Sequence, residues 1–253
     1  MSDRPVLTSA RNPRVVELAK LHEGKHRRRQ GLTLVEGPRV VADVIDHGAE
    51  LRELFHLEHD EVGQRLAHDG GVTATPVGAG VLQRLAGTEH PQGPIAVVAI
   101  PAPEPLGSVD TVVLWEVSEP GNAGAIVRTA TAFGFAVATA PGTADLWGPK
   151  VIRSAAGSQF AARVSRLCDD ALPELQRAGL QTIATLAAGG AHPRSIQRRG
   201  PVAIIVGNEA HGLPAVVADG ADDRFTIPLP GAVESLNAAV AAALAMYELR
   251  PPS

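Results

Sequence analysis

The sequence of 253 residues has little cysteine and few aromatic residues, and both shortages limit what the protein can be. Its single cysteine, Cys168, excludes an intrachain disulfide framework and a zinc site built from several cysteines. Aromatic residues make up 3% of the chain, so the core has to be built from Ala, Val, Leu and Ile. No apolar run has the length of a signal peptide or of a membrane-spanning helix. These absences favour a cytoplasmic globular protein.

The motifs of several enzyme classes are also missing. Gly207 and Gly212 have the glycine spacing of a phosphate-binding loop, but no Lys-Ser or Lys-Thr pair follows them. No G-x-G-x-x-G opens a helix after a first strand, which weakens a dinucleotide-binding interpretation. There is no H-E-x-x-H and no G-x-S-x-G, so a metalloprotease or a serine hydrolase has no local support and no metal site is expected.

Charge is distributed unevenly along the chain. The formal net charge is −4, yet eight cations lie between Arg4 and Arg29 and are opposed only by Glu17 and Glu23. A cluster such as KHRRRQ can attract phosphates at short range. It is equally well explained as the solvated end of a helix. The candidate RNA-binding residues are Arg27, Arg28, Arg29 and Arg39.

Alternating apolar strands and amphipathic helices predict an α/β protein. The proline-rich stretch PAPEPLGS, residues 101–108, is the best candidate for a linker. The expected division is a basic arm over residues 1–29, a first domain over 30–101 and a second over 106–253. In the second domain, apolar runs such as residues 111–117 predict a mostly parallel sheet, which places functional loops at the carboxyl ends of its strands.

Four polar or glycine-rich loops in the second half follow predicted strands, and three of them carry candidate site residues. In the first loop, Asn122 is placed to cap a helix, and Arg128 lies further along that helix as an exposed arginine or an anion ligand. In the second loop, Gly207 allows close approach of a ligand to the backbone, and Glu209 projects from the strand end. In the third loop, Ser235 is expected to cap a helix that begins at residue 236, which leaves the amide of Asn237 free for a ligand.

The stretches EPGNAGAIVRTA (119–130), IIVGNEAHGL (204–213) and IPLPGAVESLNAAVAAALA (227–245) are more specific together than any one of them. In order and spacing they resemble the three motifs of the SpoU family of RNA 2′-O-methyltransferases. The stretches LTLVEGPRVVADVIDHG and LAGTEHPQGPIAVV resemble the L30e-like substrate-binding domain of that family. The resemblance implies a trefoil-knotted catalytic domain, S-adenosylmethionine as cofactor, an RNA substrate, and a homodimer with the active site at the subunit interface.

The resemblance also implies a set of site residues. The implied catalytic residues are Asn122, Arg128, Glu209, Ser235 and Asn237. The implied cofactor-binding residues are Thr185, Leu186, Val206, Gly207, Gly212, Ile227, Leu229, Ser235 and Leu236. Arg128, supplied by the second subunit, would bind a phosphate and help to remove the ribose 2′-OH proton. Because an arginine stays protonated in proteins, we expect Arg128 to be essential without assigning it as the literal base.

The sequence leaves several alternatives open. His211 and Glu119 depart from the usual residues of the motifs, and Glu234 has no assigned role. The two-domain layout favours 23S ribosomal RNA over transfer RNA as substrate. A non-catalytic RNA-binding protein on the same scaffold, and a methyltransferase that modifies a base, are the competing hypotheses.

Overall fold

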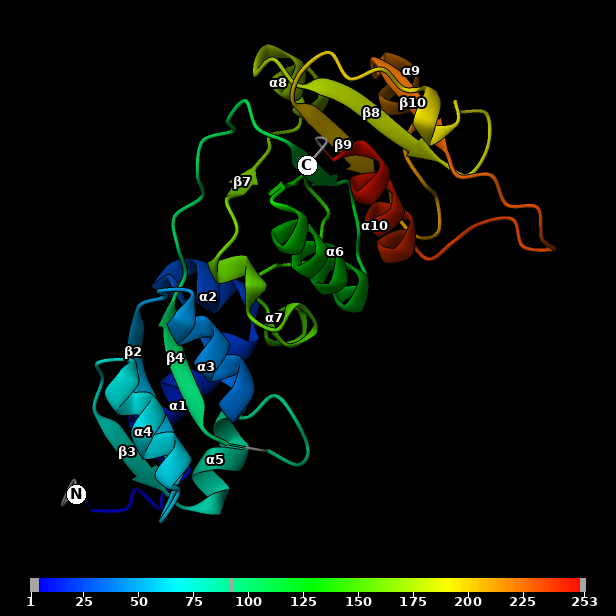
Figure 1. Ribbon diagram of the computed structural model, residues 1–253. Coiled ribbons are helices and arrows are strands. Elements are labelled where there is room, and N and C mark those ends of the chain that lie inside the picture. The colour runs from blue at the N-terminus through cyan, green and yellow to red at the C-terminus, as the bar shows by residue number, and fades with distance from the viewer. Residues whose placement is uncertain (1–4, 92, 251–253) are drawn as a thin grey trace. The chain divides into compact units, whose positions relative to one another are not determined.

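The computed structural model describes residues 5–91 and 93–250, and contacts between residues divide the chain into two compact units (Figure 1). Unit 1 consists of the residues up to Ala102 together with Asp145–Ala161, and unit 2 contains Pro103–Ala144 and the residues from Ala162 onward. Both units combine helices with a sheet, which confirms the predicted α/β class. The grouping differs from the expected division, which placed residues 1–29 apart and 145–161 in the second domain. The expected division into an arm, a first domain and a second domain stays a prediction about function.

Unit 1 is built on a sheet of four strands in the order β1-β4-β2-β3. The strands are β1 (Leu32–Glu36), β2 (Leu51–Leu57), β3 (Ala74–Val77) and β4 (Ile95–Ala99). The strand β4 pairs antiparallel with β1 and β2, whereas β3 pairs parallel with β2. The helices of the first 102 residues are α1 (Pro13–Ala19), η1 (Lys20–His22), α2 (Gly24–Gln30), α3 (Pro38–Asp46), α4 (Glu61–Asp69) and α5 (Ala79–Leu85).

The N-terminal segment is part of the core of unit 1. Val15, Leu18 and Leu21 are each 0% exposed and pack with side chains of the sheet and of α5. The Asn12 side chain caps α1 by accepting a hydrogen bond from the backbone N–H of Arg14. The segment consists of three short helical pieces, α1, η1 and α2, and Gly24 begins the last of them. Residues 13–30 are therefore a packed element of unit 1.

The segment Asp145–Ala161 covers the edge strand β1 of unit 1. It contains α7 (Pro149–Ala155) and η2 (Ser158–Phe160). The hydroxyl of Thr33 in β1 donates a hydrogen bond of 2.6 Å to the carbonyl of Trp147, and Ile152 is 2% exposed within the core that β1 and α3 form. This segment therefore contributes to the core of unit 1, although it follows the first strands of unit 2 in the sequence.

Unit 2 is built on a sheet of six strands in the order β10-β8-β9-β5-β6-β7, and every pairing in it is parallel. The strands are β5 (Thr111–Leu114), β6 (Ala136–Thr139), β7 (Val164–Arg166), β8 (Gln181–Leu186), β9 (Val202–Val206) and β10 (Asp223–Thr226). The helices are α6 (Pro120–Phe133), α8 (Ala171–Arg177), η3 (Pro193–Ser195), α9 (Ala215–Gly220) and α10 (Ala238–Leu249). All residues of β5 and β9 are buried, as expected for strands covered on both faces.

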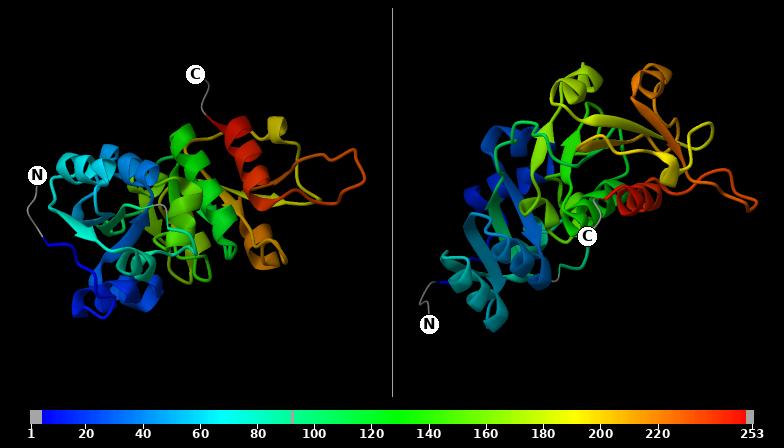
Figure 2. Two further views of the ribbon diagram at one scale, coloured as in Figure 1. Left: turned by 90° about the horizontal axis from the view of Figure 1, so that it is seen from below. Right: turned by 45° about the horizontal axis from the view of Figure 1, so that its top comes forward.

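Two boundaries in unit 2 differ from the sequence prediction and shape the site. Strand β5 ends at Leu114 rather than at residue 117, because Glu116 has a positive φ of 56° that no strand residue adopts. Helix α10 begins at Ala238 rather than at residue 236, so the loop after β10 is longer than expected. This loop projects beyond the sheet before it returns to α10, and α10 lies beside α6 (Figures 1 and 2). None of the helices in the described part of the chain is long and apolar enough to cross a membrane.

Candidate functional site

A hollow of about 540 Å³ lies at the carboxyl ends of β8, β9 and β10 in unit 2. Because parallel strands end at the same edge of a sheet, residues distant in the sequence meet there. All residues predicted to bind the cofactor line this hollow: Thr185, Leu186, Val206, Gly207, Gly212, Ile227, Leu229, Ser235 and Leu236. The volume lies within the roughly 300–1,000 Å³ of small-molecule sites. The structure thus brings the predicted set together, and its binding role stays a prediction.

The loop after β9, residues 207–212, forms one wall of this hollow, called the cofactor wall below. Its first residue, Gly207, has no room for a side chain. A Cβ atom on Gly207 would lie 2.5 Å from the carbonyl carbon of Gly212. The backbone of Asn208 exchanges two hydrogen bonds with Gly212, at 3.1 Å and 2.9 Å, which closes the loop into a tight turn. Glycine at 207 is therefore required for the shape of this wall.

Glu209 accepts hydrogen bonds from the loop that precedes α6. Its carboxylate accepts from the side chain of Asn122 at 2.9 Å, from the backbone N–H of Glu119 at 3.2 Å and from that of Ser118 at 3.3 Å. Partial burial acts to raise the pKa of Glu209, but hydrogen bonds from Asn122 and from backbone N–H groups outweigh it and lower this pKa below its usual value. Glu209 is therefore ionised at neutral pH and is a weak proton acceptor.

Asn122 and Asn237 continue this network across to α10. The amide nitrogen of Asn237 donates to the side-chain oxygen of Asn122 at 2.8 Å. The side-chain oxygen of Asn237 accepts from the backbone N–H groups of Ala239 and Val240. Asn237 is thus the N-cap of α10, and the predictions that Ser235 caps the helix and that Asn237 has a free amide are wrong. Asn122 is likewise the third residue of α6 and not its cap, since α6 begins at Pro120.

Arg128 lies apart from the other predicted catalytic residues. Asn122, Glu209, Ser235 and Asn237 all line the hollow, but Arg128 does not. It is exposed on α6, six residues after Asn122, which corresponds to about 9 Å along the helix and about 240° around it. Within residues 5–91 and 93–250 no carboxylate forms a salt bridge with Arg128. Arg128 therefore lies outside the hollow of its own chain.

The basic N-terminal cluster carries less free charge than the sequence suggests. Arg27 is 5% exposed, and its guanidinium pairs with Asp145 at 2.7 Å and donates to the carbonyl of Leu21 at 2.6 Å. All three guanidinium nitrogens of Arg27 are thus engaged inside unit 1, which argues against the prediction that Arg27 binds RNA. Arg28, Arg29 and Arg39 are exposed. The salt bridges within the cluster are Lys20–Glu17, Lys25–Glu23 and Arg29–Glu17, and Arg4 lies outside the described residues.

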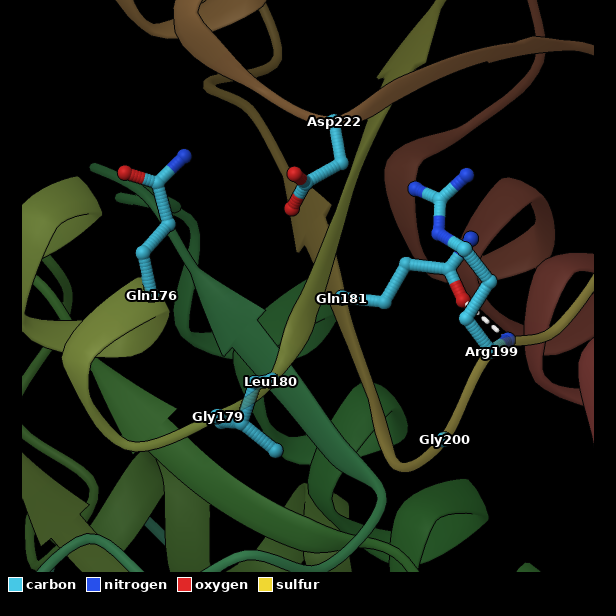
Figure 3. Close-up of a pocket in the computed structure, with 7 residues that line it drawn as sticks. All are labelled: Gln176, Gly179, Leu180, Gln181, Arg199, Gly200 and Asp222. Carbon is cyan, nitrogen blue, oxygen red and sulfur yellow. Dashed lines mark hydrogen bonds between the residues drawn. The ribbon is translucent and has the colours of Figure 1, made fainter.

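A second hollow of about 320 Å³ lies at the opposite, amino-terminal ends of β8, β9 and β10 (Figure 3). Its polar side chains bind one another or the backbone. The Gln181 side chain accepts from the backbone N–H of Arg199 at 2.8 Å and donates to Asp223 at 2.7 Å. Asp222 accepts from the backbone N–H of Thr182 at 2.8 Å and from its hydroxyl at 2.7 Å. These bonds join the strand ends, which is a structural role.

Comparison with known proteins identifies the class of this site. The profile of the SpoU rRNA Methylase family matches residues 110–247, which is more than half of the chain and contains the whole hollow. The chain belongs to the SpoU family. The profile of the MRM3-like substrate binding domain matches residues 12–96, so the SpoU half is preceded by a substrate-binding domain.

Relatives and solved structures agree with the SpoU assignment over nearly the full length. The chain is 34% identical to the 23S rRNA (guanosine(2553)-2′-O)-methyltransferase RlmP of Bacillus subtilis, covering 96% of this chain and 98% of that protein. It superposes on the AdoMet-bound rRNA methyltransferase of Sinorhizobium meliloti with a TM-score of 0.84 at 30% identity, covering 96% of both chains. The SpoU methyltransferase AviRb of Streptomyces viridochromogenes, in complex with AdoMet, gives a TM-score of 0.83 at 28% identity over 94% of this chain and 97% of that one.

Membership of the SpoU family confirms several predictions. The protein is an RNA 2′-O-methyltransferase that uses S-adenosylmethionine, and its N-terminal half is a substrate-binding domain.

No cluster of three or more histidine, cysteine or acidic residues able to hold a metal ion is found among the described residues. The predicted site residues do not include Ser118 and Asn208, whose side chains bond between the loops of the hollow. The position of Asn208 next to Glu209 was the available signal.

Proposed function

We propose that this protein transfers a methyl group from S-adenosylmethionine to a ribose 2′-hydroxyl of 23S ribosomal RNA. The observation that supports this best is the network of Glu209, Asn122 and Asn237 at the rim of the 540 Å³ hollow. The choice of 23S RNA rests on the likeness to RlmP, which covers both units of the chain. We place the reaction in the cytoplasm, and we place a trefoil knot around the loops after β9 and β10.

The lining of the hollow fits S-adenosylmethionine, which supplies an electrophilic methyl group on a positively charged sulfur when bound. Leu186, Ile227 and Leu236 provide an apolar wall, and the tight turn at Gly207 exposes backbone for close contact. Glu209 and Glu234 are the carboxylates of the lining, which contains no lysine or arginine among the described residues. This charge balance favours a cationic ligand.

Glu209 and the two asparagines act by positioning groups, because their hydrogen-bonding atoms already bind one another. Glu209 holds the loop of Ser118 and Glu119, and Asn122 connects that loop to α10 through Asn237. Fixing the ribose hydroxyl in line with the methyl group removes much of the entropic barrier. The guanidinium of Arg128 binds the adjacent phosphate and stabilises the 2′-oxygen as its proton leaves to solvent.

A second copy of the chain supplies Arg128 to the hollow. An apolar stripe is exposed on α10, with Val240 47%, Leu244 40% and Tyr247 51% accessible, and Phe133 at the end of α6 extends it. The rings of Phe133 and Tyr247 lie 6.2 Å apart, so α6 and α10 form one continuous surface. Large exposed apolar patches mark association sites. A symmetric dimer through this surface places α6, and with it Arg128, at the interface.

In unit 1 the exposed cations Arg28, Arg29 and Arg39 contact RNA phosphates. Arg27 is left out of this set, since it is buried against Asp145. Each phosphate contact contributes to the salt dependence of RNA affinity.

Mixed dimers test the proposal. Arg128→Ala and Gly207→Val chains are co-expressed with different tags, and the heterodimer is isolated by two affinity steps. Each homodimer is expected to be inactive. The heterodimer has one intact hollow facing one intact arginine, so it should show about half of the parent activity.

Two results would contradict this arrangement. An inactive heterodimer would mean that Arg128 acts in the hollow of its own chain. Failure to recover any heterodimer would contradict the proposal that the chain forms a dimer. Mapping of 2′-O-methyl groups in RNA from a deletion strain, compared with the parent strain, distinguishes 23S RNA from transfer RNA. A methylated base, or cofactor binding without any methyl transfer, would instead support the competing hypotheses.

A further inference from the structure

Asn208 is not used in the proposed mechanism, yet its side chain makes three hydrogen bonds. Its oxygen accepts from the backbone N–H of Ala210 at 2.8 Å and from that of His211 at 3.2 Å. Its nitrogen donates to the backbone carbonyl of Glu116 at 2.8 Å. The two ends of one amide therefore serve different loops: the oxygen shapes the loop after β9, and the nitrogen reaches the loop after β5.

The bond to Glu116 holds the backbone at an unusual conformation. Glu116 has a φ of 56°, which is uncommon for a residue other than glycine. A Cβ atom on Gly142 would lie 2.9 Å from the Cγ atom of Glu116, so a glycine is needed where this side chain passes. Such a conformation persists only when its surroundings hold it in place. The Asn208 amide supplies one of these restraints.

The neighbouring residue binds the same loop two positions further on. Glu209 accepts from the backbone N–H groups of Ser118 and Glu119. Adjacent side chains of the loop after β9 thus hold the loop after β5 at two points, one at a carbonyl and one at N–H groups. This loop leads directly into α6, which carries Asn122 and Arg128.

We propose that Asn208 is a positioning residue that fixes the cofactor wall relative to the loop that leads into α6. This inference rests on the proposed function. Methyl transfer needs the cofactor, held by the wall at Gly207–Gly212, and the ribose, held near Asn122, to be aligned. The bond from Asn208 to Glu116 sets the spacing of these two loops. Because a small misplacement of reacting groups slows a reaction strongly, loss of this bond lowers the rate more than it lowers cofactor affinity.

Three substitutions separate the two tasks of the amide. Asn208→Asp and Asn208→Ser both keep an oxygen that can accept from residues 210 and 211, but neither can donate to Glu116 as the amide does, the serine being too short. Asn208→Ala removes both the acceptor oxygen and the donor nitrogen. The matched control is Asn12→Asp, which keeps the acceptor that caps α1 in unit 1.

The readouts are the dissociation constant for S-adenosylmethionine by calorimetry, kcat on RNA at saturating cofactor, and the melting temperature. For Asn208→Asp and Asn208→Ser we expect kcat to fall roughly tenfold, with a change in cofactor affinity of less than about threefold. For Asn208→Ala we expect both quantities to worsen by roughly tenfold. The Asn12→Asp control should keep parental kcat and affinity.

The outcomes separate the inference from the proposed function. A parent protein that neither binds S-adenosylmethionine nor methylates RNA overturns the proposed function itself. A working parent whose Asn208→Ser variant folds and keeps parental kcat overturns the positioning role. A serine variant that loses as much cofactor affinity as the alanine variant would also overturn it, since Asn208 would then act only by shaping the loop that holds the cofactor. If the charge of Asn208→Asp prevents folding, the serine variant decides the question.

Discussion

The two ends of the parallel sheet in unit 2 are built from similar residues but perform different tasks. At the amino-terminal end, Gln181, Arg199 and Asp222 bond to neighbouring strands and loops around a hollow of about 320 Å³. At the carboxyl end, Glu209 and Asn122 bond to each other at the rim of a larger hollow, of about 540 Å³. There the polar network lies beside apolar side chains and the close turn at Gly207, and these groups remain available to contact a ligand. A polar cluster therefore indicates a functional site only where the cavity beside it retains groups that the cluster does not use.

The largest expected effect is on cofactor affinity, and it distinguishes substitution of a glycine at the carboxyl end of the sheet from substitution of one at the amino-terminal end. Gly207→Val would press a side chain into the backbone of Gly212, so cofactor affinity should fall roughly a hundredfold or more. Gly200→Val places its side chain in open space at the other end and should bind the cofactor normally. Calorimetric titration with S-adenosylmethionine makes the comparison. Equal binding by the two variants would show that the turn at Gly207 is not the cofactor wall.

A smaller effect is expected when a carboxylate at each end is replaced by an amide: kcat changes at one end and the free energy of unfolding at the other. Glu209→Gln keeps one acceptor oxygen but turns an amide toward N–H donors, so kcat should fall roughly tenfold to a hundredfold while the fold remains. Asp222→Asn disturbs the bonds to Thr182 and should lower the free energy of unfolding by about 1–2 kcal/mol without changing kcat. Urea unfolding and single-turnover methylation measure the two quantities. Loss of activity in folded Asp222→Asn would remove the distinction between the two ends.

The smallest effect is a pH dependence that both ends share. Burial raises the pKa of Asp222 and of Glu209, but hydrogen bonds outweigh it, and the pKa of each lies below its usual value. A carboxyl group with a lowered folded-state pKa stabilises the fold above its unfolded pKa of about 4, and this stabilisation is lost as the pH falls through the folded pKa. The free energy of unfolding should therefore decrease below about pH 4, and less steeply in Glu209→Gln and Asp222→Asn. An unchanged slope in both variants would contradict the lowered pKa values.

The sequence predicts the order of the strands and helices well, because apolar runs and turn residues are local signals. It also predicts which loops meet, since the carboxyl ends of parallel strands share an edge. The individual lining residues from Thr185 to Leu236 come from the family resemblance. Side-chain partners across loops were not predictable in this way. Asn122 was expected to cap its own helix and Asn237 to keep its amide free for a ligand, but the two side chains bind each other at 2.8 Å.

The burial of Arg27 shows a second limit. In the run Arg27, Arg28 and Arg29 the three side chains are chemically identical, and helical geometry turns them about 100° apart from one to the next. Which of them points inward depends on Asp145, more than a hundred residues away, whose carboxylate lies 2.7 Å from the Arg27 guanidinium. No periodic pattern in the N-terminal segment contains that information.

The cover that residues 145–161 place on strand β1 limits how this enzyme can be cut or recombined. A fragment that ends at residue 102 would lose the bond from Thr33 to Trp147 and would uncover the apolar core in which Ile152 packs. A fragment that begins at residue 103 would expose the apolar side of α7, where Val151, Ile152 and Ala155 are buried in the whole chain. Exchange of the substrate-binding half for that of a relative therefore requires two grafts, one at the start of the chain and one between β6 and β7.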